Sequence, residues 1–220
     1  MTAVALAWSG GKESALALRA LREEHGIEPR ALMTTFTEGY ERVSMHAVRR
    51  ELLRRQAQAA GVGLVEVGIP PGCTDEEYRV RMAAAFDRDP LREVEAVAFG
   101  DLYLEDVRAY REARLAEAGR RALFPLWGRD TAALAREFVA SGFRATLVCV
   151  DPRRLDAAFA GRAYDAALLA DLPDGVDPCG ENGEFHTFVH AGPVLSAPVA
   201  CATGAVVERD GFVFCDVVAA

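Results

Sequence analysis

The sequence lacks the patterns of a disulfide-stabilised, zinc-binding or membrane-spanning protein. Its five cysteines, at positions 73, 149, 179, 201 and 215, are odd in number, widely spaced and free of any CxxC pair. This usage predicts a reducing compartment. No apolar run approaches the roughly 18 residues that a membrane-spanning helix needs, and the first predicted strand begins where a signal peptide would lie. We therefore expect a cytoplasmic protein without a membrane partner.

Positive charge is also in short supply. The chain has 25 Lys and Arg against 33 Asp and Glu, which gives a formal net charge of -8 at pH 7. Such a balance excludes a protein that binds nucleic acid by bulk attraction. The basic run at Arg49, Arg50, Arg54 and Arg55 is typical of a solvated helix face, and a local basic binding face is the alternative.

No internal repeat and no low-complexity linker divides the chain. Its 220 residues, 51% of them hydrophobic, are enough for one large domain or two small ones. The first part alternates between apolar runs and helical patterns, whereas the last part is rich in glycine, proline and turn signals. We expect two domains, residues 1–125 and residues 126–220.

The first part of the chain has the spacing of βα units. Strands are predicted at 3–8, 30–36, 64–69, 94–99 and 123–126, and helices at 14 onward, 46–60, 74–87, 104–118 and 131–141. This alternation predicts an α/β fold with a Rossmann-like, mostly parallel sheet sandwiched by helices. Ligands of such sheets bind beyond the carboxyl ends of the strands. The loop at 9–14, the region 34–38 and Gly100-Asp101 should therefore surround one crevice.

The last part predicts a smaller α+β domain. Strands are expected at 145–150, at 185–189 and over 206–218, where Arg209-Asp210-Gly211 is a good hairpin signal. The long irregular segment between the first two is too rich in paired polar and apolar residues for a linker. Long structured loops of this kind usually carry function.

Residues 9–14 read Ser-Gly-Gly-Lys-Glu-Ser and join the first strand to a helix. Adjacent glycines let a backbone approach a ligand closely, and a helix start presents unpaired N–H groups and a positive dipole end. Lys12, at an exposed helix start, adds a positive charge, and the hydroxyls of Ser9 and Ser14 add donors. The loop favours phosphate, and an ordinary glycine turn is the alternative.

The spacing of this loop excludes two common phosphate loops. A Walker A loop requires glycine where Leu6 stands and a hydroxyl where Glu13 stands. A dinucleotide fingerprint requires a third glycine close behind Gly10 and Gly11, but none comes before Gly26. The loop resembles instead the Ser-Gly-Gly-x-Asp-Ser loop of the ATP pyrophosphatases, the PP-loop, with Glu13 in place of the usual aspartate.

A second motif lies in the segment DPCGENGEFHTFVHAGP at 177–193. Residues 181–187 resemble the Glu-Gly-Gly-Glu-Tyr/Phe-Glu-Thr motif of the diphthine-ammonia ligase family of PP-loop ATPases, within the adenine nucleotide alpha hydrolase-like superfamily. The other matching pieces follow in order: the PP-loop, Met45-His46, FGDLYLEDVR at 99–108, PLWGRD at 125–130 and SGFRATLVCV at 141–150. The resemblance covers nearly the whole chain.

This resemblance implies an ATP-dependent, AMP-forming amide ligase. Ligases of the family bind ATP in the first domain, adenylate a carboxylate, release pyrophosphate and let ammonia displace AMP. By motif position, Lys12, Asp101, Glu181 and Glu184 are the expected catalytic residues, and Mg²⁺ is expected with ATP near Asp101. The expected nucleotide-binding residues are Ser9, Gly10, Gly11, Lys12, Ser14, Thr34, Thr35, His46 and Gly100. Helix capping remains the alternative for Asp101 and His46, and a plain turn for the two glutamates.

The same motif implies an acceptor site at Asn182, Gly183, His186 and Thr187. Two of these depart from the family pattern, because Asn182 replaces a glycine and His186 replaces an acidic residue. The loss of a negative charge favours an acceptor that differs from the cationic diphthine or is more anionic. The implied partners are a nucleotide, ammonia and a carboxylate acceptor, which in the family is diphthine on a translation elongation factor. A homodimer is a further possibility.

Three alternatives remain. His186 and His190 with Cys179 resemble a zinc set, but a strand places residues i and i+4 about 13 Å apart, too far for one ion without a bulge. Cys179 is a candidate nucleophile, as in the related PP-loop tRNA thiolases, or a buried structural thiol. The alternative function is a module that binds ATP or AMP without ligation, and the two glutamates in a glycine loop favour the enzyme.

Overall fold

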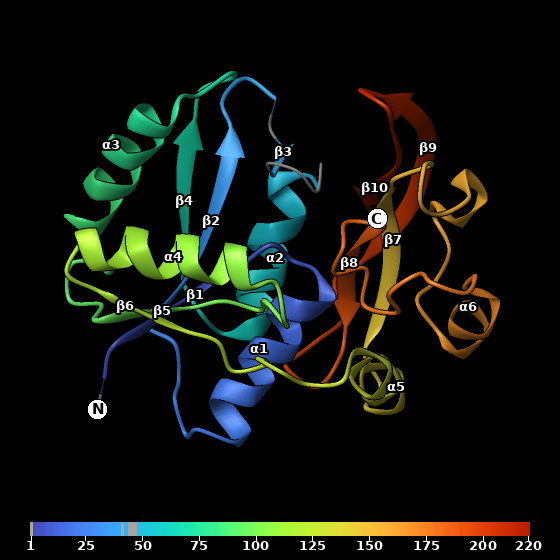
Figure 1. The fold of residues 1–220 in the computed structure, drawn as a ribbon, viewed down its shortest axis with the longest axis horizontal. Coiled ribbons are helices and arrows are strands. Elements are labelled where there is room, and N and C mark those ends of the chain that lie inside the picture. The colour runs from blue at the N-terminus through green and yellow to red at the C-terminus, as the bar shows by residue number, and fades with distance from the viewer. Residues whose placement is uncertain (1, 41, 44–47) are drawn as a thin grey trace.

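Short apolar strands build the first sheet of the computed structural model, which describes residues 2–40, 42–43 and 48–220. Five strands run parallel in the order β4-β2-β1-β5-β6, and a short strand, β3, pairs antiparallel with the end of β2 (Figure 1). Their bounds are β1 Val4–Ala7, β2 Ala31–Thr37, β3 Arg42–Val43, β4 Leu64–Ile69, β5 Ala96–Ala98 and β6 Arg121–Leu123.

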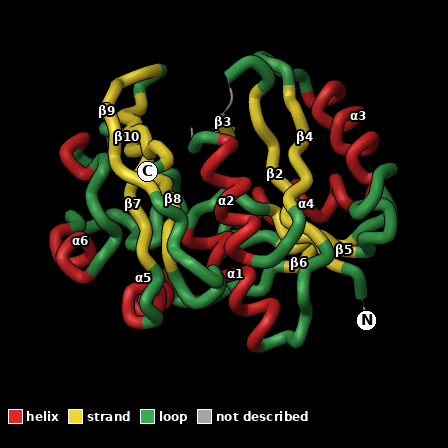
Figure 2. Tube along the Cα trace, turned by 180° about the vertical axis from the view of Figure 1, so that it is seen from behind, coloured by secondary structure: helices red, strands yellow, loops and turns green. Residues whose placement is uncertain are grey.

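Helices cover both faces of this sheet, since alternate strand residues point to opposite sides. Leu6 of β1 packs in the core with α1 (Lys12–Glu23) and α2 (Arg50–Ala60), whereas its neighbour Ala5 packs with α3 (Asp75–Phe86) and α4 (Glu105–Glu117). Figure 2, seen from behind, shows α1 and α2 in front of the strands.

Local signals mark two helix ends as the sequence predicts. Gly61 ends α2 in the left-handed conformation, at a φ of 73°, and Thr74 opens α3 with a complete capping box to Glu77.

The second sheet is antiparallel and has the order β8-β7-β10-β9. Two helices, α5 (Thr131–Ala140) and α6 (Ala166–Asp171), pack at its outer side (Figure 1). The predicted hairpin is confirmed, with Asp210 and Gly211 at φ values of 55° and 79° in its turn. The strand bounds are β7 Arg144–Val150, β8 Phe185–Ala191, β9 Cys201–Arg209 and β10 Phe212–Ala219.

One buried apolar cluster continues from the first sheet into the second. Leu16 and Leu18 of α1 belong to the same core as Leu147 of β7 and Phe188 of β8. The edge strand β8 thus lies against the start of α1, where the PP-loop is. No helix in the described parts of the chain is both long enough and apolar enough to cross a bilayer.

The α/β class with a mostly parallel, helix-flanked sheet is confirmed, but several details differ. The strand predicted at 123–126 is β6 at Arg121–Leu123. Phe124 and Leu126 pack against the core from the turn that follows this strand. The sequence pattern did not predict α6, whose cap Asp165 accepts from the N–H of Leu168. The helix predicted over 46–60 begins only at Arg50, because Arg49 before it is extended; positions 46 and 47 lie outside the described residues.

Candidate active site

The PP-loop, residues 9–14, turns from β1 into α1 and is fastened by its own hydroxyl groups. The N–H of Gly11 donates to Ser9 Oγ at 3.2 Å, and Ser14 Oγ donates to the carbonyl of Gly11 at 2.8 Å. Gly10 has a φ of 80°, a conformation that favours glycine. The loop is therefore held in shape by hydrogen bonds within the chain itself.

Gln56 of α2 holds this loop from the side of the helix. Its Nε2 donates to the carbonyls of Gly10, at 2.9 Å, and of Val189, and its Oε1 accepts from Trp8 Nε1 at 2.8 Å. A Cβ on Gly10 would lie 2.8 Å from Gln56 Oε1. Gln56 thus joins the residue that follows β1, the PP-loop and β8 through one fully buried amide.

Lys12 is the only lysine of the chain, and it is buried with 1% of its surface exposed. Its ammonium donates to the carbonyl of Cys179 and lies 2.6 Å from Glu13 Oε1. It also lies 4.8 Å from the ring centroid of Phe185. The expectation of an exposed lysine is wrong, because a segment 167 residues further along the chain folds over the helix start.

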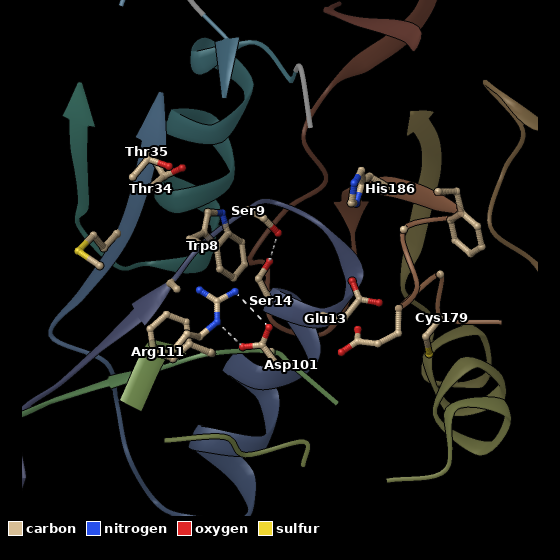
Figure 3. A pocket seen from close by; sticks show the side chains of 18 of the residues that line it. Trp8, Ser9, Glu13, Ser14, Thr34, Thr35, Asp101, Arg111, Cys179 and His186 are labelled. Carbon is tan, nitrogen blue, oxygen red and sulfur yellow. Dashed lines mark hydrogen bonds and ion pairs between the residues drawn. The ribbon is translucent and has the colours of Figure 1, made fainter. Parts of the chain in front are cut away.

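A cavity of about 440 Å³ opens beside the PP-loop, at the carboxyl ends of β1, β2 and β5. The sheet order reverses direction between β1 and β5, which is where α/β sheets bind ligands. Of the residues expected from the sequence, those that line it are Ser9, Ser14, Thr34, Thr35, Gly100, Asp101, Glu181, Gly183 and His186 (Figure 3).

Six other expected residues belong to the PP-loop, to the loop before β8 or to β8 itself without lining the cavity: Gly10, Gly11, Lys12, Asn182, Glu184 and Thr187. The remaining one, His46, lies outside the described residues. The structure thus brings the PP-loop, the end of β2, the end of β5 and the glycine-bearing segment before β8 to one place.

Asp101 stands in the cavity wall just after β5 and is paired with Arg111 of α4. Arg111 Nε lies 2.7 Å from Asp101 Oδ2, and Nη2 donates to Oδ1 at 3.1 Å. The guanidinium lies over the ring of Phe99, 4.4 Å from its centroid. The alternative of a helix cap is wrong, since α4 begins after Leu104 and has no side-chain cap.

The segment 177–184, here called the glutamate loop, contributes Glu181 to the cavity. Glu181 Oε1 accepts from the N–H of Leu102 at 2.8 Å, which joins this loop to the segment after β5. Burial raises the pKa of Glu181 to about 7, with the charges of Glu13 and Asp101 adding to the rise and the Leu102 N–H opposing it. A carboxyl group with a pKa in this range can gain or lose a proton near neutral pH.

Glu184 shapes the glutamate loop. It is 2% exposed, and its Oε1 accepts from the N–H of Asp177 at 3.2 Å and from Asn182 Nδ2 at 3.1 Å. Its Oε2 is buried without a hydrogen-bond partner among the residues that the structure describes. Within the loop, the carboxylate of Glu181 faces the cavity and that of Glu184 faces the loop's own backbone.

Thr187 of β8 caps α1. Its Oγ1 accepts from the N–H of Lys12 at 3.1 Å, and the side chain is 1% exposed. The structure assigns this side chain to the helix start instead of the cavity, although the motif position implies a contact with the acceptor.

Cys179 is a buried thiol. Its Sγ donates to the carbonyl of Thr131 at 3.3 Å, and burial raises the pKa of the thiol well above its ordinary value. Such a thiol is a poor nucleophile, because the thiolate is the reactive form. Within the described ranges, no group of three or more His, Cys, Asp or Glu side chains is arranged to hold a metal ion.

Several lining residues carry no motif that the sequence reveals. Tyr78 and Met82 of α3 and Arg111 of α4 reach the cavity only because these helices pack beside the strand ends. Gln56 did have a signal, because it occupies the buried stripe of α2 together with Leu52, Leu53, Ala57 and Ala60. A polar side chain on an apolar stripe indicates a buried hydrogen-bond network.

Comparison with known families accounts for both parts of the chain. A model of the diphthamide synthase N-terminal domain matches residues 1–122, and a model of the diphthamide synthase C-terminal domain matches residues 130–208. The search among curated proteins gives no match. The first family model covers the PP-loop and the β2 and β5 ends, and the second covers the glutamate loop. The chain therefore belongs to the diphthamide synthase family, an ATP-dependent ligase family.

Proposed function

We propose that the chain is an AMP-forming amide ligase that adenylates a carboxylate and transfers ammonia to it, with an acceptor that has diverged from diphthine. One observation carries this proposal: Ser9 and Ser14 of the PP-loop line the same cavity as Glu181 and Gly183 of the glutamate loop. A nucleotide and an acceptor must meet in one place for group transfer. We further propose a domain boundary near residue 125, with this cavity where the two domains meet.

The nucleotide half of the cavity supports ATP. The hydroxyls of Ser9 and Ser14 and the N-terminal end of α1 favour a phosphate group, and Thr34 and Thr35 stand further along the wall at the end of β2. Lys12 stands behind the loop, where it fixes the helix start to the carbonyl of Cys179. We propose that Lys12 acts by holding the PP-loop in shape.

The acidity of the cavity fits the Mg²⁺ that accompanies ATP. Glu13, Asp101 and Glu181 line it against the guanidinium of Arg111, so a bound triphosphate needs a further neutralising cation. Mg²⁺ prefers oxygen ligands and keeps several of its waters, which suits a site without a complete protein ligand set in the described residues. We propose that Glu13 and Asp101 hold it together with phosphate oxygens. Bound there, the ion would neutralise the leaving pyrophosphate.

The glutamate loop supports the second half-reaction. Ammonia attacks the acyl carbon, the bond to AMP breaks, and the proton released from nitrogen passes to Glu181, whose pKa of about 7 suits this role. Glu184 positions the loop through Asn182 and the N–H of Asp177. Gly183 and His186 line the cavity on the acceptor side.

The test is AMP formation from ATP, Mg²⁺ and ammonia over a panel of carboxylates that includes a diphthine-bearing elongation factor, run on the wild type and on His186→Glu. We expect AMP only with an acceptor, an altered acceptor preference in the variant and equal ATP affinity in both. Tight ATP binding without AMP from any acceptor would favour a nucleotide-binding module. Equal amidation of diphthine by both forms would show that His186 does not redirect specificity.

A further inference from the structure

A second hollow, of about 610 Å³, adjoins the nucleotide cavity, because Gly183 and His186 line both. The rest of its wall is formed by Asp151, Arg153, Arg154, Asn182 and Phe212. We call this hollow the arginine groove. It is formed where the end of β7 and the start of β10 meet the glutamate loop.

Arg153 is held in a fixed orientation on the wall of the groove. Its Nε and Nη2 donate to Asp151 Oδ1 and Oδ2, each at 2.8 Å, and its own N–H donates to Oδ1 at 3.0 Å. Asp151 is 4% exposed, and the guanidinium lies 5.5 Å from the ring centroid of Phe212. A buried carboxylate thus grips one edge of the guanidinium, while the side chain as a whole is 72% exposed.

An arginine held by one edge presents its remaining N–H groups in a fixed direction. Guanidinium has five N–H donors, and the bonds to Asp151 use two of them. The outward donors match the spacing of carboxylate or phosphate oxygens. Asp151 already restricts the Arg153 side chain. Binding of an anion there therefore costs less side-chain conformational entropy than binding at a free arginine.

Arg154 adds a second positive charge to the same groove. Its Nε lies 3.9 Å from Asp151 Oδ2, and its side chain is 53% exposed. One carboxylate therefore faces two guanidinium groups, which leaves the arginine groove positive in a chain of net charge -8. The adjoining nucleotide cavity is lined by three carboxylates and by the guanidinium of Arg111, so its lining is the more acidic of the two.

We propose that the arginine groove binds a second anionic group of the acceptor, so that the substrate is a carboxylic acid that carries another carboxylate or a phosphate-like group. The carboxylate to be adenylated then passes His186 into the nucleotide cavity. This inference rests on the proposed function and names its substrate class. A cationic head group in this groove would meet two arginines, which disfavours it.

The test is calorimetric binding of small acids to the full chain saturated with a non-hydrolysable ATP analogue. The probes are glutarate, 4-phosphonobutyrate, the monoamide glutaramate and the cationic 4-(trimethylammonio)butyrate. We expect the first two to bind at least about tenfold more tightly than glutaramate, since a charge-assisted pair contributes at least that factor. The tighter of these two identifies the carboxylate or the phosphate as the natural anion.

Two variants and one control locate the effect. Arg153→Gln and Arg154→Gln should each lower glutarate affinity about tenfold and leave glutaramate and the ATP analogue unchanged. Arg153→Gln leaves Asp151 without its main partner and can fail to fold. In that case Arg154→Gln alone tests the anion site, because the exposed Arg154 side chain can be replaced without loss of the fold. Arg136→Gln, an exposed arginine on α5, is the matched control and should change nothing.

Equal affinity for glutarate and glutaramate would overturn the inference, as would tighter binding of the cationic probe or an equal loss in Arg136→Gln. So would a chain that binds the ATP analogue and none of the acids. A failure of the proposed function has a different appearance: no AMP forms with any acceptor, while the preference for dianions and its loss in Arg154→Gln persist.

Discussion

The backbone N–H of Lys12 donates a hydrogen bond to the side-chain oxygen of Thr187 at 3.1 Å, across 175 residues of sequence. A second bond beside it runs from the N–H of Val189 to the carbonyl of Gly10 at 2.9 Å. Both join the PP-loop to β8, the strand that follows the glutamate loop. The shape of the PP-loop therefore depends on the second sheet.

Replacement of Thr187 by valine tests this dependence. Thr187→Val keeps the volume but leaves the N–H of Lys12 buried without an acceptor, which costs about 1–3 kcal/mol. We expect this loss in the free energy of unfolding by urea, together with weaker ATP binding. Thr187→Ser retains the hydroxyl and should recover most of both. A valine variant as stable as the wild type would show that this cap is unimportant.

Gln56 should be among the most sensitive polar residues of the fold. Gln56→Leu removes one acceptor and one donor group that together serve Trp8, Gly10 and Val189, and we expect a loss of at least about 2 kcal/mol in unfolding free energy. The matched control is Gln58→Leu on the exposed side of α2, which should stay within about 0.5 kcal/mol of the wild type. Similar losses in both variants would contradict a specific stabilising role of the Gln56 hydrogen bonds.

The burial of Lys12 can be measured chemically, because the chain has no other lysine. An amine-reactive ester should leave Lys12 unlabelled in the native protein and label it in urea, as read by peptide mass spectrometry. Arg136→Lys places a lysine on the exposed side of α5 and should be labelled in both conditions. Native labelling of Lys12 at the rate of this surface lysine would refute the buried ion pair with Glu13.

Glu181 should give the unliganded protein a recognisable pH dependence. Its pKa is raised from 4.5 to about 7, so between these values the folded chain holds a proton that the unfolded chain has lost. Its contribution to stability therefore falls as pH rises from about 4.5 to about 7.

Glu181→Gln removes this titration and should flatten that part of the stability curve, measured by urea unfolding at a series of pH values. Glu105→Gln, at an exposed position of α4, serves as the control and should keep the wild-type slope. A slope unchanged in Glu181→Gln would mean that Glu181 has the same pKa in the folded and the unfolded chain.

The elements that local patterns specify were predictable. The strand at Leu64–Ile69 and the turn at Asp210-Gly211 follow from apolar runs and glycine, and the start of α3 follows from its capping box. The PP-loop and the strand ends could be assigned to one edge of the sheet, because parallel strands all end there.

What sequence patterns miss are contacts between distant segments. The burial of Lys12 depends on the carbonyl of Cys179, and the pairing of Asp101 depends on Arg111, which lies on a helix whose position no local pattern specifies. Motif spacing predicts that Glu181 and Glu184 lie close together. Only the fold of the loop shows that the carboxylate of Glu181 faces the cavity, whereas that of Glu184 faces the backbone of the loop itself.

The central claim, cleavage of ATP between its α and β phosphates with ammonia as the final nucleophile, is tested most directly by product identification. Phosphorus NMR of the wild type with ATP, Mg²⁺, ammonia and the best acceptor of the panel should show AMP and pyrophosphate in equal amounts. The amide should appear by mass spectrometry in the same amount, and ¹⁵N-ammonia should label it. ADP and inorganic phosphate as the products, or AMP without any labelled amide, would contradict the account.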